Sequence, residues 1–238
     1  PLTVEYQKYR LKVLFLQAVK MPVLMHRCLP CLFGLLFIFQ FALAQEPTAG
    51  KKGCISGNCT DGQGVFVFEE GNKFTGTFVN GQPTNGTLEL ANGEKYVGGI
   101  DDGQPSGMGV YTWPSGQKYE GNFVKGEKTG PGRYQFPNGD SYEGSLVNGS
   151  FQGIGVYTWA NGERYQGEYQ NNTKHGMGTM HFKSGDVYEG EYDQGIRRGM
   201  GTMYYVSGDT ATGRWDTAAC NCVMRYLNGD KFVGLIGG

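Results

Sequence analysis

Residues Tyr165 to Phe182 read YQGEYQNNTKHGMGTMHF and are followed by the turn sequence Lys183-Ser184-Gly185-Asp186. The same pattern begins again 23 residues later, where the chain reads YEGEYDQGIRRGMGTMYY from Tyr188. Self-similarity at a fixed period of about 20 to 50 residues is typical of a repeat array. The period therefore decides how every local pattern in this chain is interpreted.

The period extends over most of the chain. A Gly-x-Gly motif begins eleven residues after each of four consecutive tyrosine anchors, and degenerate copies lie at Lys51-Lys52-Gly53 and Ala211-Thr212-Gly213. The aromatic-x-Gly anchors begin at Phe74, Tyr96, Tyr119, Tyr142, Tyr165 and Tyr188, with spacings of 22, 23, 23, 23 and 23 residues, and at Phe232. From residue 51 to residue 234 the chain resembles the MORN repeat family, whose pattern is close to YEGEWxNGxxHGxGTxxxxxG.

Each unit contains two short runs in which side chains alternate between the two faces of an expected strand. One face carries aromatic residues and glycine, and the other is largely polar. In the unit at Tyr142, the first face carries Tyr142, Gly144 and Leu146, followed by Gly155, Tyr157 and Trp159. The sequence predicts an all-β fold: an elongated, single-layer antiparallel meander of tandem β-hairpins, forming an open-sided twisted sheet of about seventeen strands.

The glycines have two expected roles. A glycine within a strand leaves a hole over which a neighbouring ring can lie flat. A glycine after Asn or Ser in a turn between units, as in Asn138-Gly139, supplies the positive φ that a tight hairpin needs. Within units we expect longer loops, such as Asn171 to His175.

The N-terminal part differs in composition from the repeats. Residues 1–20 are interpreted as an upstream extension, and residues 21–44 as a secretory signal peptide with an apolar run and an Ala-Leu-Ala box before Gln45. Residues 45–52 are expected to be a mobile leader. The array is expected at 53–238, with about eight to nine units that are degenerate at both ends, and a truncated C-terminal unit is one interpretation of its end. An exported protein is expected (periplasmic, outer-envelope or extracellular), and an uncleaved N-terminal membrane anchor is the alternative.

The charge balance argues against polyanionic partners. Without residues 1–44 the chain has 16 basic and 21 acidic residues, a net charge of −5. It has no basic stripe for phosphates, so nucleic-acid binding is not expected. Simple electrostatic attraction to anionic lipid is not expected either, although membrane contact of another kind remains open.

Four cysteines lie in the end units. Pairing is expected in an exported protein, and the two ends of a long array cannot touch. Cys54 should therefore pair with Cys59, because a disulfide needs Cα atoms within about 7 Å. Cys220 and Cys222 have three possible interpretations: small residues that replace the Gly-x-Gly glycines, a strained redox-active bridge, or an intermolecular link.

The sequence offers little that suggests catalysis. A repeat presents the same groups many times, whereas acid-base chemistry needs two groups in distinct environments. The recurrent Glu120, Glu143 and Glu189 fit a solvated edge position better. His175 and His181 are too few for a histidine-based nucleophile and lack metal-ligand spacing with the cysteines. No enzyme activity, metal site or cofactor is expected.

The aromatic face is the feature that most directly indicates a function, because a large exposed apolar strip normally marks a contact site. The alternative is that the rings fold onto glycines and one another and little is exposed. The resemblance to MORN arrays implies a non-enzymatic scaffold or protein-interaction module with an unidentified partner, which includes a second copy of this chain. Lipid-headgroup or glycan binding at the cell envelope is the second hypothesis. The candidate binding face comprises Tyr111, Trp113, Tyr119, Phe123, Tyr134, Phe136, Tyr142, Tyr157, Trp159, Tyr165 and Tyr169.

Overall fold

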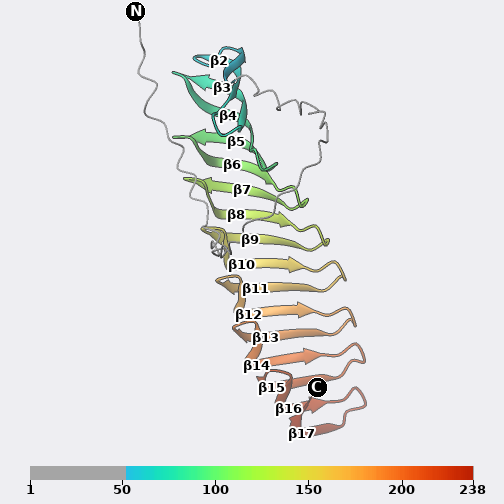
Figure 1. The fold of residues 1–238 in the computed structure, drawn as a ribbon. Helices are drawn as coiled ribbons and strands as arrows, with labels where there is room; N and C mark the ends of the chain where they lie inside the picture. The colour runs from blue at the N-terminus through green and yellow to red at the C-terminus, as the bar shows by residue number, and fades with distance from the viewer. Residues whose placement is uncertain (1–51, 238) are drawn as a thin grey trace, which may run out of the picture. The chain divides into compact units, whose positions relative to one another are not determined.

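The computed structural model describes residues 52 to 237, which form one 17-stranded antiparallel sheet. Each strand pairs with the strand before it and the strand after it, in sequence order along the array (Figure 1). The predicted extension, signal peptide and most of the leader lie outside the described residues. The strands are β1 (Gly53–Gly57), β2 (Gly62–Val67), β3 (Lys73–Val79), β4 (Gln82–Glu89), β5 (Lys95–Asp101), β6 (Gln104–Thr112), β7 (Lys118–Val124), β8 (Glu127–Gln135), β9 (Ser141–Val147), β10 (Ser150–Thr158), β11 (Arg164–Gln170), β12 (Thr173–His181), β13 (Val187–Asp193), β14 (Ile196–Tyr204), β15 (Thr210–Asp216), β16 (Ala219–Arg225) and β17 (Lys231–Ile236).

The predicted all-β meander is confirmed, and the sheet does not close, because β1 and β17 do not pair with each other. Among the described residues there is no helix, and so no helix that could cross a membrane. The alternation of faces is confirmed as well. In β9, Tyr142 and Leu146 are buried, whereas Glu143, Ser145 and Val147 are exposed.

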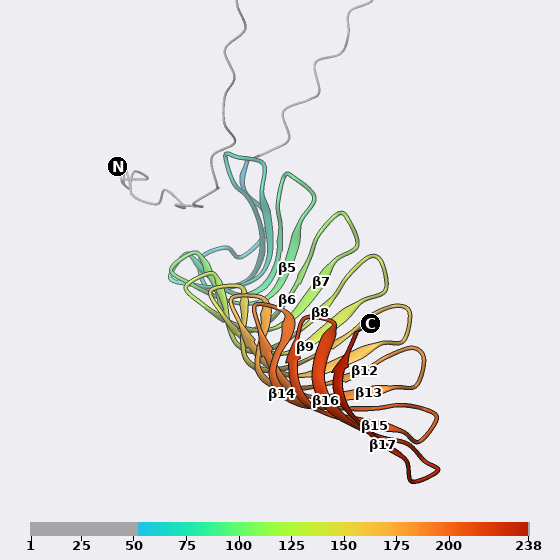
Figure 2. The same ribbon diagram turned by 90° about the horizontal axis from the view of Figure 1, so that it is seen from below.

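The strands are strongly curved when viewed along the array (Figure 2). This curvature explains how a single layer buries large rings. Tyr96, Tyr119, Tyr142, Tyr165 and Tyr188 are 0% exposed, which a flat one-layer sheet could not achieve. We infer that the sheet curls around its aromatic side, which we call the concave face. The hydrophobic core is a continuous row of buried rings along this face, and it therefore extends along the length of the array.

A tyrosine ring lies over two paired glycines in each of the five central units. Gly144 pairs with Gly155, and a Cβ built on Gly155 would lie 2.5 Å from the Tyr142 hydroxyl oxygen and 2.6 Å from a ring carbon. The same hydroxyl donates a 2.9 Å hydrogen bond to the Ser145 carbonyl. The ring thus needs both glycines, one from each strand of the hairpin. Equivalent hydrogen bonds join Tyr96 to Gly99, Tyr119 to Asn122, Tyr165 to Glu168 and Tyr188 to Glu191.

The two glycines of Gly-x-Gly have different roles. The second, Gly178 in β12, lies under the Tyr165 ring, opposite Gly167. The first, Gly176, has φ of +55° and lies where the pairing register between β11 and β12 shifts. A residue with positive φ at such a position is typical of a β-bulge, which bends the strand. The motif therefore provides both the bend and the space for the ring.

The turns between units match their prediction, and those within units do not. Gly139 follows Asn138 with φ of +92°, and its N–H donates to the Phe136 carbonyl at 3.0 Å. Within a unit, however, β11 and β12 are separated only by Asn171 and Asn172, which have φ of +50° and +67°. The predicted long loop at Asn171 to His175 is wrong. The bulge at Gly176 absorbs the extra residues, so β12 begins already at Thr173.

Carboxylates connect successive turns between units. Asp140 Oδ1 accepts a 2.8 Å hydrogen bond from Ala160 N in the next turn, and Oδ2 accepts one of 2.8 Å from the Tyr157 hydroxyl. These bonds favour the ionised carboxyl and lower the pKa of Asp140, the Ala160 contact contributing most. Asp209 accepts from Leu227 N at 2.8 Å, and its pKa is lowered chiefly by the Ser207 hydroxyl.

The end units lack the anchor tyrosine and use cysteine instead. In the first unit Cys59 Sγ lies 2.7 Å from the position that a Cβ on Gly64 would take. In the last complete unit Ala211, which is fully buried, replaces the tyrosine, and Cys222 pairs with Gly213 where the other units pair two glycines. Without a ring above it, this position has room for a cysteine side chain.

Gly155→Ala should destabilise the array by about 1 to 3 kcal/mol, because the added methyl collides with the Tyr142 ring. Tyr142→Ala should cost about 3 to 5 kcal/mol by emptying the same space. Urea unfolding of the two single variants and the double variant measures the coupling. The double variant should be more stable than the sum of the single losses predicts. Additive losses would show that the ring and the glycine do not share this space.

Stability should also fall on acidification. The pKa of Asp140 is lower in the folded chain than in the unfolded chain, where it is about 3.9. Its contribution to the free energy of unfolding is therefore fully present above the unfolded pKa and is lost as the pH falls through the folded pKa. Urea midpoints between pH 7 and pH 2 should therefore drop at the acid end, and Asp140→Asn should drop less than the unaltered chain. Asp101→Asn, at an exposed carboxylate with no side-chain hydrogen bond among residues 52–237, is the matched control. An equal acid slope for Asp140→Asn and the unaltered chain would contradict the prediction.

Candidate functional site

The structure divides the predicted aromatic face into a core set and a rim set. The core set is buried and cannot contact a partner while the sheet keeps its curl. It consists of Tyr119, Phe123, Tyr134, Tyr142, Tyr165 and Tyr169, with exposures from 0% to 7%. The rim set is only partly buried and packs against the core. It consists of Tyr111, Trp113, Phe136, Tyr157 and Trp159.

Three of the rim residues, Trp113, Phe136 and Trp159, belong to a regular row where the strands enter the turns between units. We use the name aromatic row for the residue that opens each of these turns in five consecutive units. Neighbouring rings hold the row in place: Trp113 stacks on Tyr134 with ring centroids 6.2 Å apart, and Phe136 lies 6.0 Å from Tyr157. All its members are partly exposed. The aromatic row is Trp113, Phe136, Trp159, Phe182 and Tyr205.

Three basic side chains lie on the concave face, over these rings. Lys128 Nζ is 5.0 Å from the centroid of Trp113, Lys174 Nζ is 5.1 Å from that of Tyr192, and Arg197 Cζ is 4.7 Å from that of Trp215. Such cation–π contacts stabilise a charge that is partly removed from water. The sequence analysis did not identify these residues. All three stand two residues before a Gly-x-Gly, so aligning the repeats by that motif would have found them.

Two hollows adjoin Lys174. The first has a volume of about 250 Å³ and apolar walls from Met180, Phe182 and Ile196, with Tyr192 and Arg197 also lining it. The second has a volume of about 390 Å³ and is lined by polar residues that include Gln170, Asn171, His175 and Gln194. Lys174 lines both hollows, and its ammonium group lies over the aromatic rings of the concave face.

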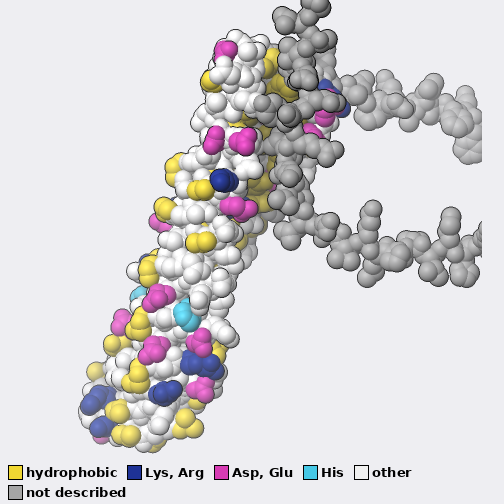
Figure 3. All heavy atoms as spheres, turned by 90° about the vertical axis from the view of Figure 1, so that its left-hand side faces the viewer, with side chains coloured by type: hydrophobic (Ala, Val, Ile, Leu, Met, Phe, Trp, Pro, Cys, Tyr) yellow, Lys and Arg dark blue, Asp and Glu magenta, His cyan; other side chains and the backbone are white. Residues whose placement is uncertain are grey.

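The opposite, convex face carries a second regular feature that the sequence analysis missed. The middle residue of Gly-x-Gly points away from the core and is exposed and apolar in four units: Met108 by 66%, Ile154 by 62%, Met177 by 57% and Met200 by 55%. On the side where the within-unit turns lie, apolar side chains are separated from one another by charged and polar ones (Figure 3).

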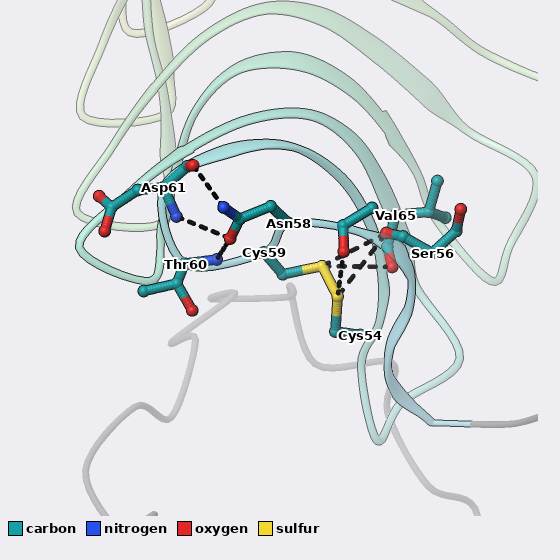
Figure 4. Close-up of a disulfide and its surroundings, with 8 residues drawn as sticks. Cys54, Ser56, Asn58, Cys59, Thr60, Asp61 and Val65 are labelled. Carbon is teal, nitrogen blue, oxygen red and sulfur yellow. Dashed lines mark hydrogen bonds between the residues drawn. A yellow bond between two sulfur atoms is a disulfide. The ribbon is translucent and has the colours of Figure 1, made fainter.

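The cysteines form two close pairs. Cys54 in β1 and Cys59 in the following turn are joined by a disulfide, with Cα atoms 5.9 Å apart (Figure 4). Next to this bridge the Asn58 side chain orders the turn, accepting from Thr60 N and Asp61 N at 3.0 Å each. The structure also joins Cys220 and Cys222 on β16, with Cα atoms 5.2 Å apart. Cys222 occupies the second-glycine position, but Cys220 lies opposite Trp215, because this unit has no bulge.

The described residues bring together little that could act on a substrate. Within residues 52–237 no group of three or more His, Cys, Asp or Glu side chains is arranged to hold a metal ion. His175 Nδ1 lies 3.7 Å from Asp193 Oδ1, at the surface. Glu120, Glu143 and Glu189 are exposed and lie on three different strands. What the geometry offers is an interaction surface: the aromatic row and the basic residues beside it.

The sequence of the central units matches the MORN repeat in five consecutive segments, at residues 96–118, 119–141, 142–164, 165–187 and 188–210. The chain is a MORN-repeat protein. These boundaries coincide with the anchor tyrosines that cover the paired glycines, so the MORN period and the structural period are the same. MORN repeats are in general non-catalytic modules for interaction with proteins or membranes.

Comparison with other proteins adds little to the MORN assignment. No curated protein sequence matches the chain. Among solved structures, the TCP domain of SAS-4 (dCPAP) from Drosophila melanogaster, in complex with a proline-rich motif of Ana2 (dSTIL), is 12% identical, with 73% of this chain and 88% of that chain covered and a TM-score of 0.41. The wild-type TCP10 domain of CPAP from Danio rerio is 13% identical over the same shares, with a TM-score of 0.42. Likeness at this level carries no information about function.

Proposed function

We propose that this MORN array is a non-enzymatic, exported interaction module that binds a partner protein along the aromatic row of its concave face. The observation that carries the proposal is the row itself: five partly exposed aromatic residues, one in each of five consecutive units, held by rings beneath them. Rigid aromatic residues provide large contact area with little loss of side-chain freedom, and they are enriched at interfaces.

The fixed period adds to this argument. Successive members of the row are 23 residues apart and lie two strands apart, which places them about 10 Å from one another across the sheet. A peptide in the extended polyproline II conformation has three residues per turn and advances about 3.1 Å per residue, so every third residue of a partner could meet one ring. An extended segment is therefore the partner shape that fits the row most simply. Export follows from the predicted signal peptide at residues 21–44, which the described residues do not include.

Site-specific photo-cross-linking in the source cells tests the proposal. Phe182→benzoylphenylalanine places a cross-linker of similar shape in the aromatic row, and we expect one discrete protein adduct. The same replacement at Glu143, exposed on the opposite face, is the control and should give none. The proposal fails if the row position forms no adduct or if both positions form the same adducts.

Glycan or lipid-headgroup binding is the second candidate function. It is favoured by the two partly exposed tryptophans of the row, Trp113 and Trp159, because sugars stack on such rings. Retention on immobilised glycans and on vesicles of defined headgroup is the measurement. Trp113→Ala and Trp159→Ala should each weaken retention severalfold under this hypothesis, whereas Glu143→Ala should not. Unchanged retention in both tryptophan variants would remove the hypothesis.

A further inference from the structure

One position of the repeat, which we call the basic column, holds different residue types in different units, although the hairpin forms with any of them. The residue two positions before Gly-x-Gly points to the concave face, opposite a buried residue of the preceding strand: Lys174 opposite Tyr169 and Arg197 opposite Tyr192. In the units before these, the column holds Lys128 and Phe151. Lys174 and Arg197 are thus the only two basic residues of this column, in the described units, that fall in consecutive repeats. Both line the apolar hollow.

The two cations lack a partner of opposite charge within residues 52–237. No carboxylate there forms an ion pair with either side chain, although the neighbouring Arg198 pairs with Asp193 at 3.0 Å. Burial and the charge of Arg197 lower the pKa of Lys174, and the charge of Glu163 only partly offsets them. Burial also lowers the pKa of Lys128, and Glu127 and Glu94 act in the opposite direction, but no neighbouring cation contributes to that shift. An anion between Lys174 and Arg197 would remove an unfavourable interaction that the free protein contains.

The apolar hollow is small, and both cationic and apolar side chains line it. Its volume of about 250 Å³ is below the range of about 300 to 1,000 Å³ that is usual for sites of drug-sized ligands. Tyr192 lines the hollow, and burial raises its pKa, so its hydroxyl stays protonated and available as a donor. The walls of Met180, Phe182 and Ile196 can receive an apolar group beside the anion. Phe182 also belongs to the aromatic row, so the hollow is continuous with the proposed interface.

The polar hollow on the other side of Lys174 provides groups that suit a peptide backbone. Gln170, Asn171 and Gln194 carry amides that can both donate and accept, as backbone N–H and C=O groups require. On the side where the within-unit turns lie, basic and acidic side chains are interspersed towards the C-terminal end of the array (Figure 3).

We propose that Lys174 and Arg197 bind the carboxylate of an aspartate or glutamate within an acidic, otherwise apolar segment of the partner protein. The apolar neighbours of that residue pack against Phe182 and Ile196, and its backbone lies along the amides of the polar hollow. The inference rests on the proposed function and names the chemical class of its partner. A lipid phosphate is the competing anion, and charge complementarity favours the peptide, because the predicted net charge of −5 repels an anionic membrane.

Selection of random dodecapeptides displayed on phage, against the full chain, provides the probe. Enriched peptides are synthesised, each also with its acidic residues replaced by the amides, and binding is followed by fluorescence of Trp159 and Trp215, which lie 5.7 Å and 4.7 Å from the two charged groups. Lys174→Met and Arg197→Met remove one charge each and keep much of the stem. Lys128→Met is the matched control on the same face. Thermal unfolding checks that each variant is folded, and Lys174→Met should not lower the midpoint.

We expect enriched peptides with an acidic residue beside apolar ones, and at least tenfold weaker binding to Lys174→Met and to Arg197→Met. Binding to Lys128→Met should change less than twofold. An amide-substituted peptide should bind weakly, and its affinity for Lys174→Met should equal its affinity for the unaltered chain. The inference is overturned if nothing is enriched, if enriched peptides lack acidic residues, or if both variants bind normally.

A separate measurement distinguishes a lipid phosphate from a peptide carboxylate as the bound anion. It also separates failure of this inference from failure of the proposed function. Vesicles containing phosphatidylserine should not bind the chain through this site. Charge-dependent binding of these vesicles, with no binding of acidic peptides, would assign the two cations to a lipid phosphate and overturn the inference. A further outcome is a set of peptides that bind more weakly to Trp159→Ala but equally well to Lys174→Met and Arg197→Met. That result would support the proposed function and refute only the specificity for an acidic residue.

Discussion

The structure depends on a contact between a tyrosine ring and two glycines that face each other across a hairpin. Tyr142 covers Gly144 of its own strand and Gly155 of the next, and its hydroxyl donates to a backbone carbonyl of its own strand, so one side chain fills the space and satisfies its polar group. A single sheet has no second layer to bury its apolar face, and such arrays are stabilised by contact between neighbouring units. Here the ring and the bulge together curl the sheet, and that curl takes the place of the second layer.

This arrangement limits what the protein can offer to a partner. The most apolar side chains are already used, because Tyr119, Tyr142 and Tyr165 are fully buried in the curl. What remains accessible on the concave face is the rim, where each unit ends in a turn, together with the side chains that lie over the rings. Interaction therefore falls to positions that the scaffold does not fix. The aromatic row and the basic column are positions of this kind, since the hairpin forms with Phe151 or with Lys174 in the same place.

The sequence contained the fold almost completely, because alternation with period two and a repeat of 23 residues determine the strands, their order and their faces. It did not contain the curvature, which arises from the bulge at glycines such as Gly176. Without the curvature, Tyr142 and Trp159 look equivalent, although one is core and the other is rim. For the same reason the loop at Asn171 was predicted too long. Lys174 and Arg197 are distant in sequence and are brought to one hollow only when β12 and β14 are placed on either side of β13.

The variation between units bears on function more directly than what the units share. Identical units stack well, and nothing in the hairpin requires a charge on the concave face, where burial disfavours the ionised form of Lys174. Phe151 shows that an apolar ring serves this position, and it stacks on Tyr142 with centroids 3.6 Å apart. The contacts with the rings offset part of this cost, but the two consecutive cations repel each other in the free array. Neither cation forms an ion pair within residues 52–237, which is why we propose an anion that arrives with a partner, and the hollow beside Phe182 is where the array has space for it.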